Sequence, residues 1–305
     1  MPTGEAPRFR RSRIRRAFDR AAPGFSGSDF LYREMARRMG ERLDMVRLEP
    51  LQILDAGCGM GADRPMLCHR YPEAQWLGVD SSQVLLRQGR CIDLAATGFF
   101  RRLLNQGRNA RAMRVGADLN ALPVSGQCMD LIWSNAALHW LDDLPETFKE
   151  FNRVLRVGGL LMFSLFGPDT LKELRLATQL AAPGSVDRTL SFTDMHDVGD
   201  MLVHGGFSDP VMDMETLTLT YADPWQALRE LKNMGSCVAT HFAAHGLTTK
   251  RFWNAVIAQW PRDAEGRYPL TFELVQGHAW KMAAKQHEDG RAVVNFMPRP
   301  DRPLR

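Results

Sequence analysis

The chain has 305 residues, of which 45% are hydrophobic, and it carries a formal net charge of +4. This length and apolar content predict one large α/β domain with a smaller helical addition, and no apolar run is long enough to span a bilayer. The near balance of 39 basic and 35 acidic residues gives no reason to expect a partner made of nucleic acid. The 5 cysteines are widely spaced and form no CxxC pair, and no secretory signal is visible. We therefore expect a reducing, bacterial cytoplasm, without disulfides and without a metal site.

The N-terminal segment combines a dense run of arginines with a helical pattern. The stretch "RFRRSRIRRAFDR" (8–20) contains seven arginines and one acidic residue. It fits either a helix face exposed to solvent or a docking surface for an acidic partner. A mitochondrial transit peptide is also rich in arginine, but here the run continues directly into a helical pattern. Residues 30–43 repeat apolar side chains at helical spacing, and we assign residues 1–48 to an N-terminal helical cap.

From residue 51 to 166, short apolar runs alternate with helical patterns, which is typical of a parallel sheet with helices on both faces. The predicted strands are 51–55, 75–80, 111–118, 129–135 and 160–166. The predicted helices are 62–71, 82–95 and 144–155, and "VGG" (157–159) is expected to close the last one. Residues 97–109 resemble an insertion with a short helix of its own.

The composition changes after Pro168. Amphipathic helices are predicted at 168–181 and 193–207, a strand at 210–221, and further helices at 223–235 and 248–260. The segment "RYPLTFEL" (267–274) predicts a last strand. We place the main domain at 49–285, with cap insertions near 168–192 and 222–265, and expect residues 286–305 to form a loose tail.

The sequence "LDAGCGMGADRP" (54–65) directly follows the first predicted strand. Gly57, Gly59 and Gly61 can adopt positive φ and have no Cβ, so a ligand can lie against the backbone. The residues after them begin a helix, whose amino terminus favours anionic or polar groups of a ligand. The combination of strand, Gly-rich turn and helix predicts a nucleotide-type binding site.

Acidic residues after the following strands bear on the class of ligand. Asp80 ends the second predicted strand, where a carboxylate can accept both ribose hydroxyls of NAD or of S-adenosylmethionine. A dinucleotide fold would show G-x-G-x-x-G, whereas here the third glycine comes one position early. This spacing argues against an NAD-dependent oxidoreductase.

Four segments, "LDAGCGMG", "GVDSS", "ADLNALPVSGQCMDLIWSNAALHWLDD" and "FNRVLRVGGLLMFS", together resemble the successive motifs of class I S-adenosylmethionine-dependent methyltransferases. The resemblance implies an α/β, Rossmann-like sheet of seven strands with the last antiparallel, and S-adenosyl-L-methionine as the cofactor. It implies that the glycines lie beneath the methionine part, that Asp80 binds the ribose and that Asp118 and Leu119 bind the adenine. The complete set of implied cofactor-binding residues is Asp55, Gly57, Gly59, Gly61, Asp80, Ser81, Asp118, Leu119, Ser134 and Asn135, of which the last two would border the sulfonium. Taken alone, Asp118 would be interpreted as a helix or turn cap.

Further segments extend the resemblance over nearly the whole chain. The stretches "IRRAFDRAAPGFSGSDFLYREMA", "SNAALHW", "LVHGGFSDP", "ALRELKNMGS" and "EGRYPLTFEL" are similar to the malonyl-acyl-carrier-protein O-methyltransferases of biotin synthesis. This resemblance implies methyl transfer to the free carboxylate of a malonyl thioester on an acidic acyl-carrier protein. It also implies that the N-terminal helix and the insertion before the last strand form the substrate cap. The sequence departs from the family at Phe25, where a tyrosine facing the active site is usual.

Other functions stay open at this point. "DFLYREMARRMGERL" and the C-terminal "VVNF" also resemble the complex I assembly factors of methyltransferase fold, which modify a protein arginine, but the "GRYPLTFEL" block favours the malonyl family. An unassigned small-molecule methyltransferase or a non-catalytic binding protein would have the same fold. The sequence does not indicate the oligomeric state.

The expected acceptor requires few protein groups. A carboxylate is already an anion near neutral pH and needs no general base, and the sequence shows neither a Cys–His or Ser–His–Asp set nor a metal-ligand cluster. His139 is expected to be a packed histidine rather than a base. We assign no catalytic residue, and the pocket candidates are Phe25, Asn135, Trp140 and Arg175. Arg175 is included because arginine binds carboxylates through paired hydrogen bonds.

Overall fold

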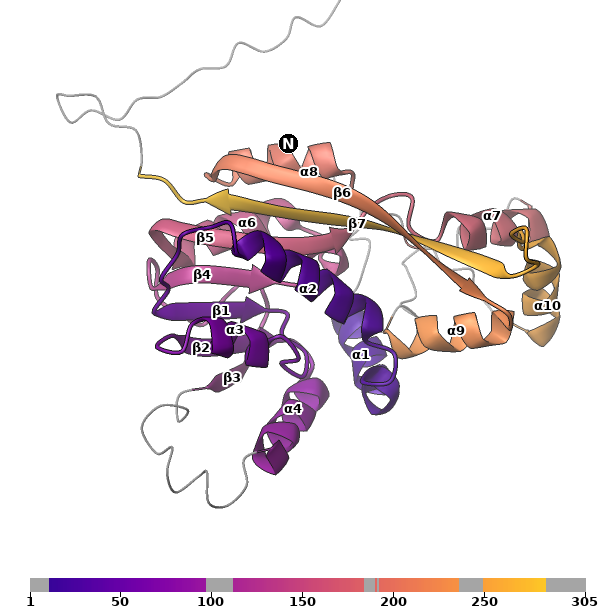
Figure 1. The fold of residues 1–305 in the computed structure, drawn as a ribbon, viewed down its shortest axis with the longest axis horizontal. Coiled ribbons are helices and arrows are strands. Elements are labelled where there is room, and N and C mark those ends of the chain that lie inside the picture. The colour runs from indigo at the N-terminus through magenta and orange to yellow at the C-terminus, as the bar shows by residue number, and fades with distance from the viewer. Residues whose placement is uncertain (1–10, 97–111, 184–189, 191, 236–248, 284–305) are drawn as a thin grey trace, which may run out of the picture.

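The computed structural model describes residues 11–96, 112–183, 190, 192–235 and 249–283. A seven-stranded sheet forms its centre, with helices on both faces (Figure 1). The strands are β1 (Gln52–Ala56), β2 (Gln75–Asp80), β3 (Met113–Gly116), β4 (Met129–Ser134), β5 (Leu155–Phe166), β6 (Ser208–Tyr221) and β7 (Tyr268–Trp280). Their order in the sheet is β3-β2-β1-β4-β5-β7-β6.

Strand direction follows the expectation for a class I methyltransferase sheet. The strands β1 to β5 pair in parallel, with Leu54 beside both Leu77 of β2 and Ile132 of β4. The last strand, β7, is antiparallel to β5 and to β6. The predicted fold class and the antiparallel last strand are therefore confirmed.

The helices before β5 are α1 (Arg11–Phe25), α2 (Phe30–Leu43), α3 (Arg64–Arg70), α4 (Gln83–Ala96), the 3-10 turn η1 (Leu138–Trp140) and α6 (Leu144–Val154). The helices after β5 are α7 (Lys172–Ala181), α8 (Met195–His204), α9 (Pro224–Asn233) and α10 (Lys250–Gln259). Each α-helix lies within or close to a segment predicted to be helical, whereas the turn η1 was not predicted. The predicted helix within 97–109 and the tail 286–305 lie outside the described residues.

Two apolar layers hold the helices on the sheet, because alternate residues of a strand face opposite sides. On one side, Leu54 and Ile132 belong to a buried cluster that includes Phe148 of α6 and residues of α8. On the other side, Ile53 and Leu131 belong to a cluster formed with α2, α3 and α4. The sheet is thus the middle of three layers, as its short apolar strands predict.

The strands β6 and β7 are the longest pair and extend beyond the other strands (Figure 1). Residues of α7, α9 and α10 pack on this extension around Tyr268, Leu270 and Phe272. These helices come from the segments that the sequence analysis assigned to cap insertions.

The prediction that "VGG" closes a helix is wrong. The helix α6 ends at Val154, and β5 begins at Leu155, five residues earlier than predicted. Gly158, with φ of +81°, lies inside β5, where the register shifts because Met129 pairs with Leu155 but Leu131 with Leu160. Gly158 therefore allows an irregularity within a strand. This irregularity requires a positive φ, as the end of a helix often does.

Candidate functional site

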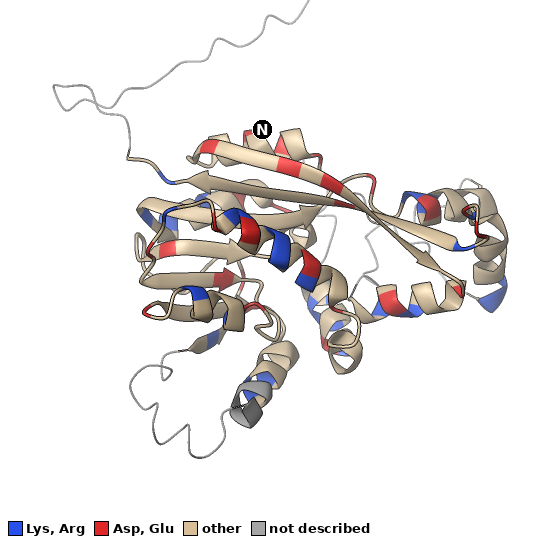
Figure 2. Cartoon of the chain, viewed as in Figure 1, with Lys and Arg blue, Asp and Glu red and all other residues tan. Residues whose placement is uncertain are grey.

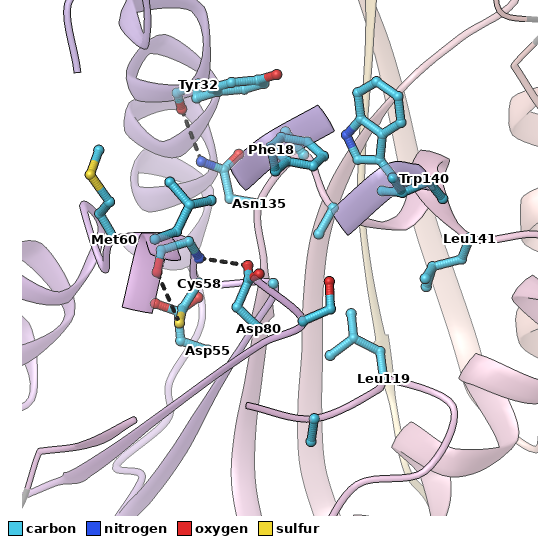
Figure 3. Close-up of a pocket in the computed structure, with 18 of the residues that line it drawn as sticks. Phe18, Tyr32, Asp55, Cys58, Met60, Asp80, Leu119, Asn135, Trp140 and Leu141 are labelled. Carbon is cyan, nitrogen blue, oxygen red and sulfur yellow. Dashed lines mark hydrogen bonds between the residues drawn. The ribbon is translucent and has the colours of Figure 1, made fainter. Parts of the chain in front are cut away.

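A cavity lies at the carboxyl ends of β1, β2 and β4, the edge at which parallel α/β sheets bind ligands. The loops after these strands and after β3 form its floor and sides, and α1 and the start of α2 add apolar side chains above them. Figure 3 shows aspartates toward one end of the cavity and aromatic rings toward the other.

The Gly-rich loop after β1 has three positive-φ glycines, with φ of +82° at Gly57, +52° at Gly59 and +79° at Gly61. A Cβ on Gly57 would lie 2.3 Å from the Cβ of Ala137, and one on Gly61 would lie 2.5 Å from Nη2 of Arg114. At Gly59 the nearest atom would be Leu85 Cδ1, at 3.9 Å. Two of the glycines are therefore required by packing of the protein, whereas Gly59 leaves open space in the cavity.

The prediction that all three glycines face the ligand needs a correction. Gly57 and Gly59 line the cavity, and Gly61 does not, because the guanidinium of Arg114 and the ring of Trp76 lie against it.

Asp80, at the end of β2, connects this strand to the Gly-rich loop through a hydrogen bond. Its Oδ2 accepts the Gly59 N–H at 2.9 Å, and its Oδ1 accepts the Ser82 N–H at 2.7 Å. Burial raises the pKa of the Asp80 carboxyl, while these two amide hydrogen bonds lower it. The carboxylate faces the cavity beside Ser81 and can accept further hydrogen bonds there.

Asp55 is a buried carboxylate without full compensation. It is 2% exposed and lines the cavity, and its Oδ2 has no hydrogen-bond partner among the described residues. Burial, and then the charge of nearby Asp63, raise the pKa of Asp55 well above its usual value. An uncompensated buried carboxylate favours a cationic group of a ligand next to it.

Asp63 is a cavity residue to which the sequence analysis gave no role. Its Oδ2 accepts hydrogen bonds from Trp133 Nε1 at 2.8 Å and from Asn135 Nδ2 at 3.0 Å. The aspartate thereby joins the Gly-rich loop to the end of β4. The position of Asp63, two residues after the last glycine of the loop, was the feature of the sequence that could have indicated this role.

Asp118 and Leu119, which are predicted to bind the adenine, both line the cavity on the loop after β3. Asp118 Oδ1 also accepts the Asn120 N–H at 3.1 Å, which agrees with the interpretation of Asp118 as a turn cap. The local hydrogen bond orders the turn that presents both residues to the cavity.

Ser134 and Asn135 have different surroundings from those predicted. Ser134 is fully buried and donates to the Ala56 carbonyl at 2.9 Å, so it joins β4 to β1 and does not line the cavity. Asn135 lines the cavity, but its amide donates to the Tyr32 carbonyl at 2.9 Å and its Oδ1 accepts from Ser164 Oγ at 2.7 Å. Asn135 therefore connects α2, the end of β4 and β5 through hydrogen bonds.

The aromatic end of the cavity contains both predicted residues, Phe25 and Trp140, together with Phe18 and Tyr32. Phe25 stacks on Tyr32 with ring centroids 5.5 Å apart, and Phe18 meets Trp140 edge to face at 5.3 Å. The hydroxyl of Tyr32 donates to the Met234 carbonyl at 2.8 Å. The sequence analysis missed Phe18 and Tyr32, although Ile14, Phe18 and Phe25 fall on one helical face.

Two further candidates lie outside the cavity lining. His139 is buried among Trp140, Phe166 and Phe192, and burial lowers its pKa to about 3, so it is the neutral, packed histidine that was expected. Arg175 contradicts its prediction as a pocket residue: its guanidinium donates to the carbonyls of Pro168 and Thr170, both at 3.0 Å. It orders the segment between β5 and α7, an arrangement that helical spacing alone does not indicate.

The described residues contain no group of three or more His, Cys, Asp or Glu placed to hold a metal ion. No helix within the described ranges is long and apolar enough to cross a membrane.

Comparisons with known proteins identify the family. Residues 54–163 match the family described as "Methyltransferase domain". The chain is 45% identical over 278 residues to the malonyl-[acyl-carrier protein] O-methyltransferase of Nitrosospira multiformis, with 90% of each chain covered. It is 42% identical to the protein of the same name from Gallionella capsiferriformans, with 92% of this chain and 94% of that one covered. The crystal structure of the YcgJ protein from Bacillus subtilis has a similar fold, with a TM-score of 0.56 and 13% identity over 80% of this chain and 98% of that one. This chain belongs to the malonyl-[acyl-carrier protein] O-methyltransferase family.

Proposed function

We propose that the protein transfers a methyl group from S-adenosyl-L-methionine to the free carboxylate of a malonyl thioester carried by an acyl-carrier protein. The observation that carries this proposal is a 45% identical relative of that name, aligned over 90% of both chains. The product would be a methyl ester, which the sequence resemblance places at the start of biotin synthesis. The cavity supports the proposal because its acidic end and its aromatic end suit two different ligands.

The acidic end fits S-adenosylmethionine group by group. Asp80 presents a carboxylate to the cavity and is suited to the two ribose hydroxyls, with Ser81 beside it. Asp55 is buried with an unpaired oxygen, which suits the ammonium group of the methionine part. Open space at Gly59 leaves room for that part against the backbone, and Asp118 and Leu119, which line the cavity, would contact the adenine. When bound, the cofactor supplies a methyl group on a positively charged sulfur.

The aromatic end is suited to the acceptor. Phe18, Phe25 and Trp140 would exclude water from a carboxylate, which makes that anion a stronger nucleophile. Since the acceptor is already ionised, the protein has to align it rather than deprotonate it. This requirement agrees with a neutral His139 outside the cavity lining. Phe25 would act here as a wall stacked on Tyr32, a role that does not need the hydroxyl of the usual tyrosine.

Purified protein tests the proposal through both ligands. Titration with S-adenosylhomocysteine should show binding, and titration with NAD should show none. Malonyl-carrier protein should be methylated, and acetyl-carrier protein should not, because it lacks the free carboxylate. Methylation of the acetyl form, or none of the malonyl form with cofactor bound, would reject this acceptor and favour the protein-arginine or small-molecule alternatives.

A further inference from the structure

The exposed arginines of α1 form a stripe on one side of the helix. Arg13, Arg16 and Arg20 are three and four residues apart, a spacing that places side chains on the same helical face. All three are exposed, and none of them forms an ion pair or hydrogen bond with the described residues. We call Arg13, Arg16 and Arg20 the arginine stripe.

The opposite face of the same helix covers the cavity. Ile14, Phe18 and Phe25 are four and seven residues apart and line the cavity, so the arginine stripe lies on the outer side of the helix above the aromatic end. A hydrogen bond of 2.6 Å from Ser82 Oγ to Asp19 Oδ1 anchors α1 beside the residues that follow Asp80. The arginine stripe and the cavity thus lie on opposite sides of one helix.

The arginines of α2 have acidic partners. On α2, Arg37 and Arg38 each pair with Glu34 at 2.8 Å, and Arg42 pairs with Asp213 and Glu215 of β6. Figure 2 shows these mixed charges on α2 and the acidic residues along β6. The arginine stripe differs from α2 because its three charges lie together on one helical face and have no acidic partner among the described residues. Such a surface attracts an acidic partner and increases its rate of association.

We propose that the arginine stripe is the docking surface for an acidic face of the carrier protein that brings the malonyl group. The inference rests on the proposed function, since the names of the relatives identify a carrier protein as the partner. A carrier docked on α1 would lie next to the end of the cavity that this helix covers. The group that carries the malonyl thioester would then reach the cavity by passing the edge of this one helix. The stripe contributes to capture of the carrier, whereas the inner face of α1 contributes to the binding of the acceptor group.

The test compares two substrates that carry the same reacting group. Malonyl-carrier protein offers both the carboxylate and the acidic surface, whereas the malonyl thioester of N-acetylcysteamine offers the carboxylate alone. The triple variant Arg13→Glu/Arg16→Glu/Arg20→Glu should raise KM for malonyl-carrier protein about tenfold or more, with the largest effect at low salt. Its kcat/KM for the small thioester should stay within about twofold of the wild-type value, which also shows that the variant is folded.

A single pair of variants supplies the matched control. Arg16→Glu should weaken carrier binding, measured by calorimetry, whereas Arg47→Glu should leave it unchanged. Arg47 is an exposed arginine between α2 and β1, at the sheet edge opposite the cavity. An unchanged KM for the carrier substrate in the triple variant, or an equal loss on both substrates, would overturn the docking proposal. Failure of the wild-type protein to methylate malonyl-carrier protein would instead count against the proposed function.

Discussion

The helices α1 and α2 are both amphipathic and rich in arginine, but they use these features differently. Apolar residues of α2 such as Leu31, Met35 and Met39 are fully buried against the sheet. The apolar face of α1 instead contributes Phe18 and Phe25 to the cavity. Arginines of α2 pair with acidic residues of the same helix and of β6, whereas the arginine stripe of α1 has no acidic partner among the residues that the structure describes. We therefore propose that the same composition serves stability in α2 and ligand or partner binding in α1.

The difference has an energetic consequence. A fully buried apolar side chain contributes about 1.5–3 kcal/mol to folding, whereas an exposed ion pair contributes about 0–1 kcal/mol. Substitutions in α2 should accordingly change the free energy of unfolding, and those in α1 should chiefly change KM. Four substitutions test this contrast, beginning with the one of largest expected effect.

Met39→Ala should lower the free energy of unfolding by about 2–5 kcal/mol, because it leaves a cavity in the core between α2 and the sheet. Urea unfolding followed by circular dichroism measures the change. The affinity of the folded variant for S-adenosylhomocysteine should remain that of the wild type. A loss below about 1 kcal/mol would show that α2 is not the structural helix described here.

Phe18→Ala should raise KM for malonyl-carrier protein about tenfold, equivalent to about 1.4 kcal/mol of binding free energy, because it removes a wall of the aromatic end. Its effect on unfolding should be smaller than that of Met39→Ala. Phe18→Leu, which keeps an apolar side chain, is the control and should recover most of the affinity. If Phe18→Ala lost stability but kept its KM, the proposed contrast between α1 and α2 would be wrong.

Arg42→Ala should lower the free energy of unfolding by about 1 kcal/mol or less, since it removes an ion pair with Asp213 and a 2.9 Å hydrogen bond to Gln276. Arg42 also lowers the pKa of Asp213, so this contribution is present above the unfolded pKa of the aspartate and is lost as pH falls through its lowered folded value. Arg16→Ala should not change stability at any pH. Equal losses in the two variants, measured by thermal unfolding between pH 3 and pH 7, would contradict this distinction.

Asp19→Asn should have the smallest effect, a shift of the pH at which cofactor affinity declines. The charge of Asp19 is one of the causes that raise the pKa of Asp80, after burial. Protonation of Asp80 removes an acceptor for the ligand, so affinity should decline as pH falls through this raised pKa. Because asparagine carries no charge but can still accept from Ser82, the decline should move to lower pH. Calorimetric titration with S-adenosylhomocysteine across pH measures the shift, and a shift to higher pH would contradict the assignment.

Features that depend on local sequence were predicted well. The strands and helices follow from hydrophobic periodicity, and Asp80 was identified at the end of a predicted strand. The resemblance to class I methyltransferases pointed to Asp118 and Leu119. The Gly-rich loop was found because it directly follows a predicted strand. The reason why each position requires glycine was not predictable from the loop itself. Gly57 and Gly61 are required by the close approach of Ala137 and Arg114, which are distant in sequence.

Features that depend on tertiary contacts were predicted poorly. Helical spacing identifies the face of α7 that carries Arg175, but it does not reveal that carbonyls of the preceding segment bind the guanidinium. Ser134 and Asn135 are neighbours in sequence, yet one is buried against β1 and the other faces the cavity, because residues alternate along a strand. Tyr32 reaches the cavity because α2 begins beside it, which no local pattern shows.

The central claim is that the methyl group goes to the free carboxylate of the malonyl thioester. Reaction of malonyl-carrier protein with S-adenosylmethionine carrying an isotope-labelled methyl group, followed by mass spectrometry of the released acyl group, locates the label directly. We predict a labelled methyl ester on the malonyl carboxylate that mild alkali removes. Label on a side chain of the carrier protein, or on a carbon of the acyl chain, would contradict the account.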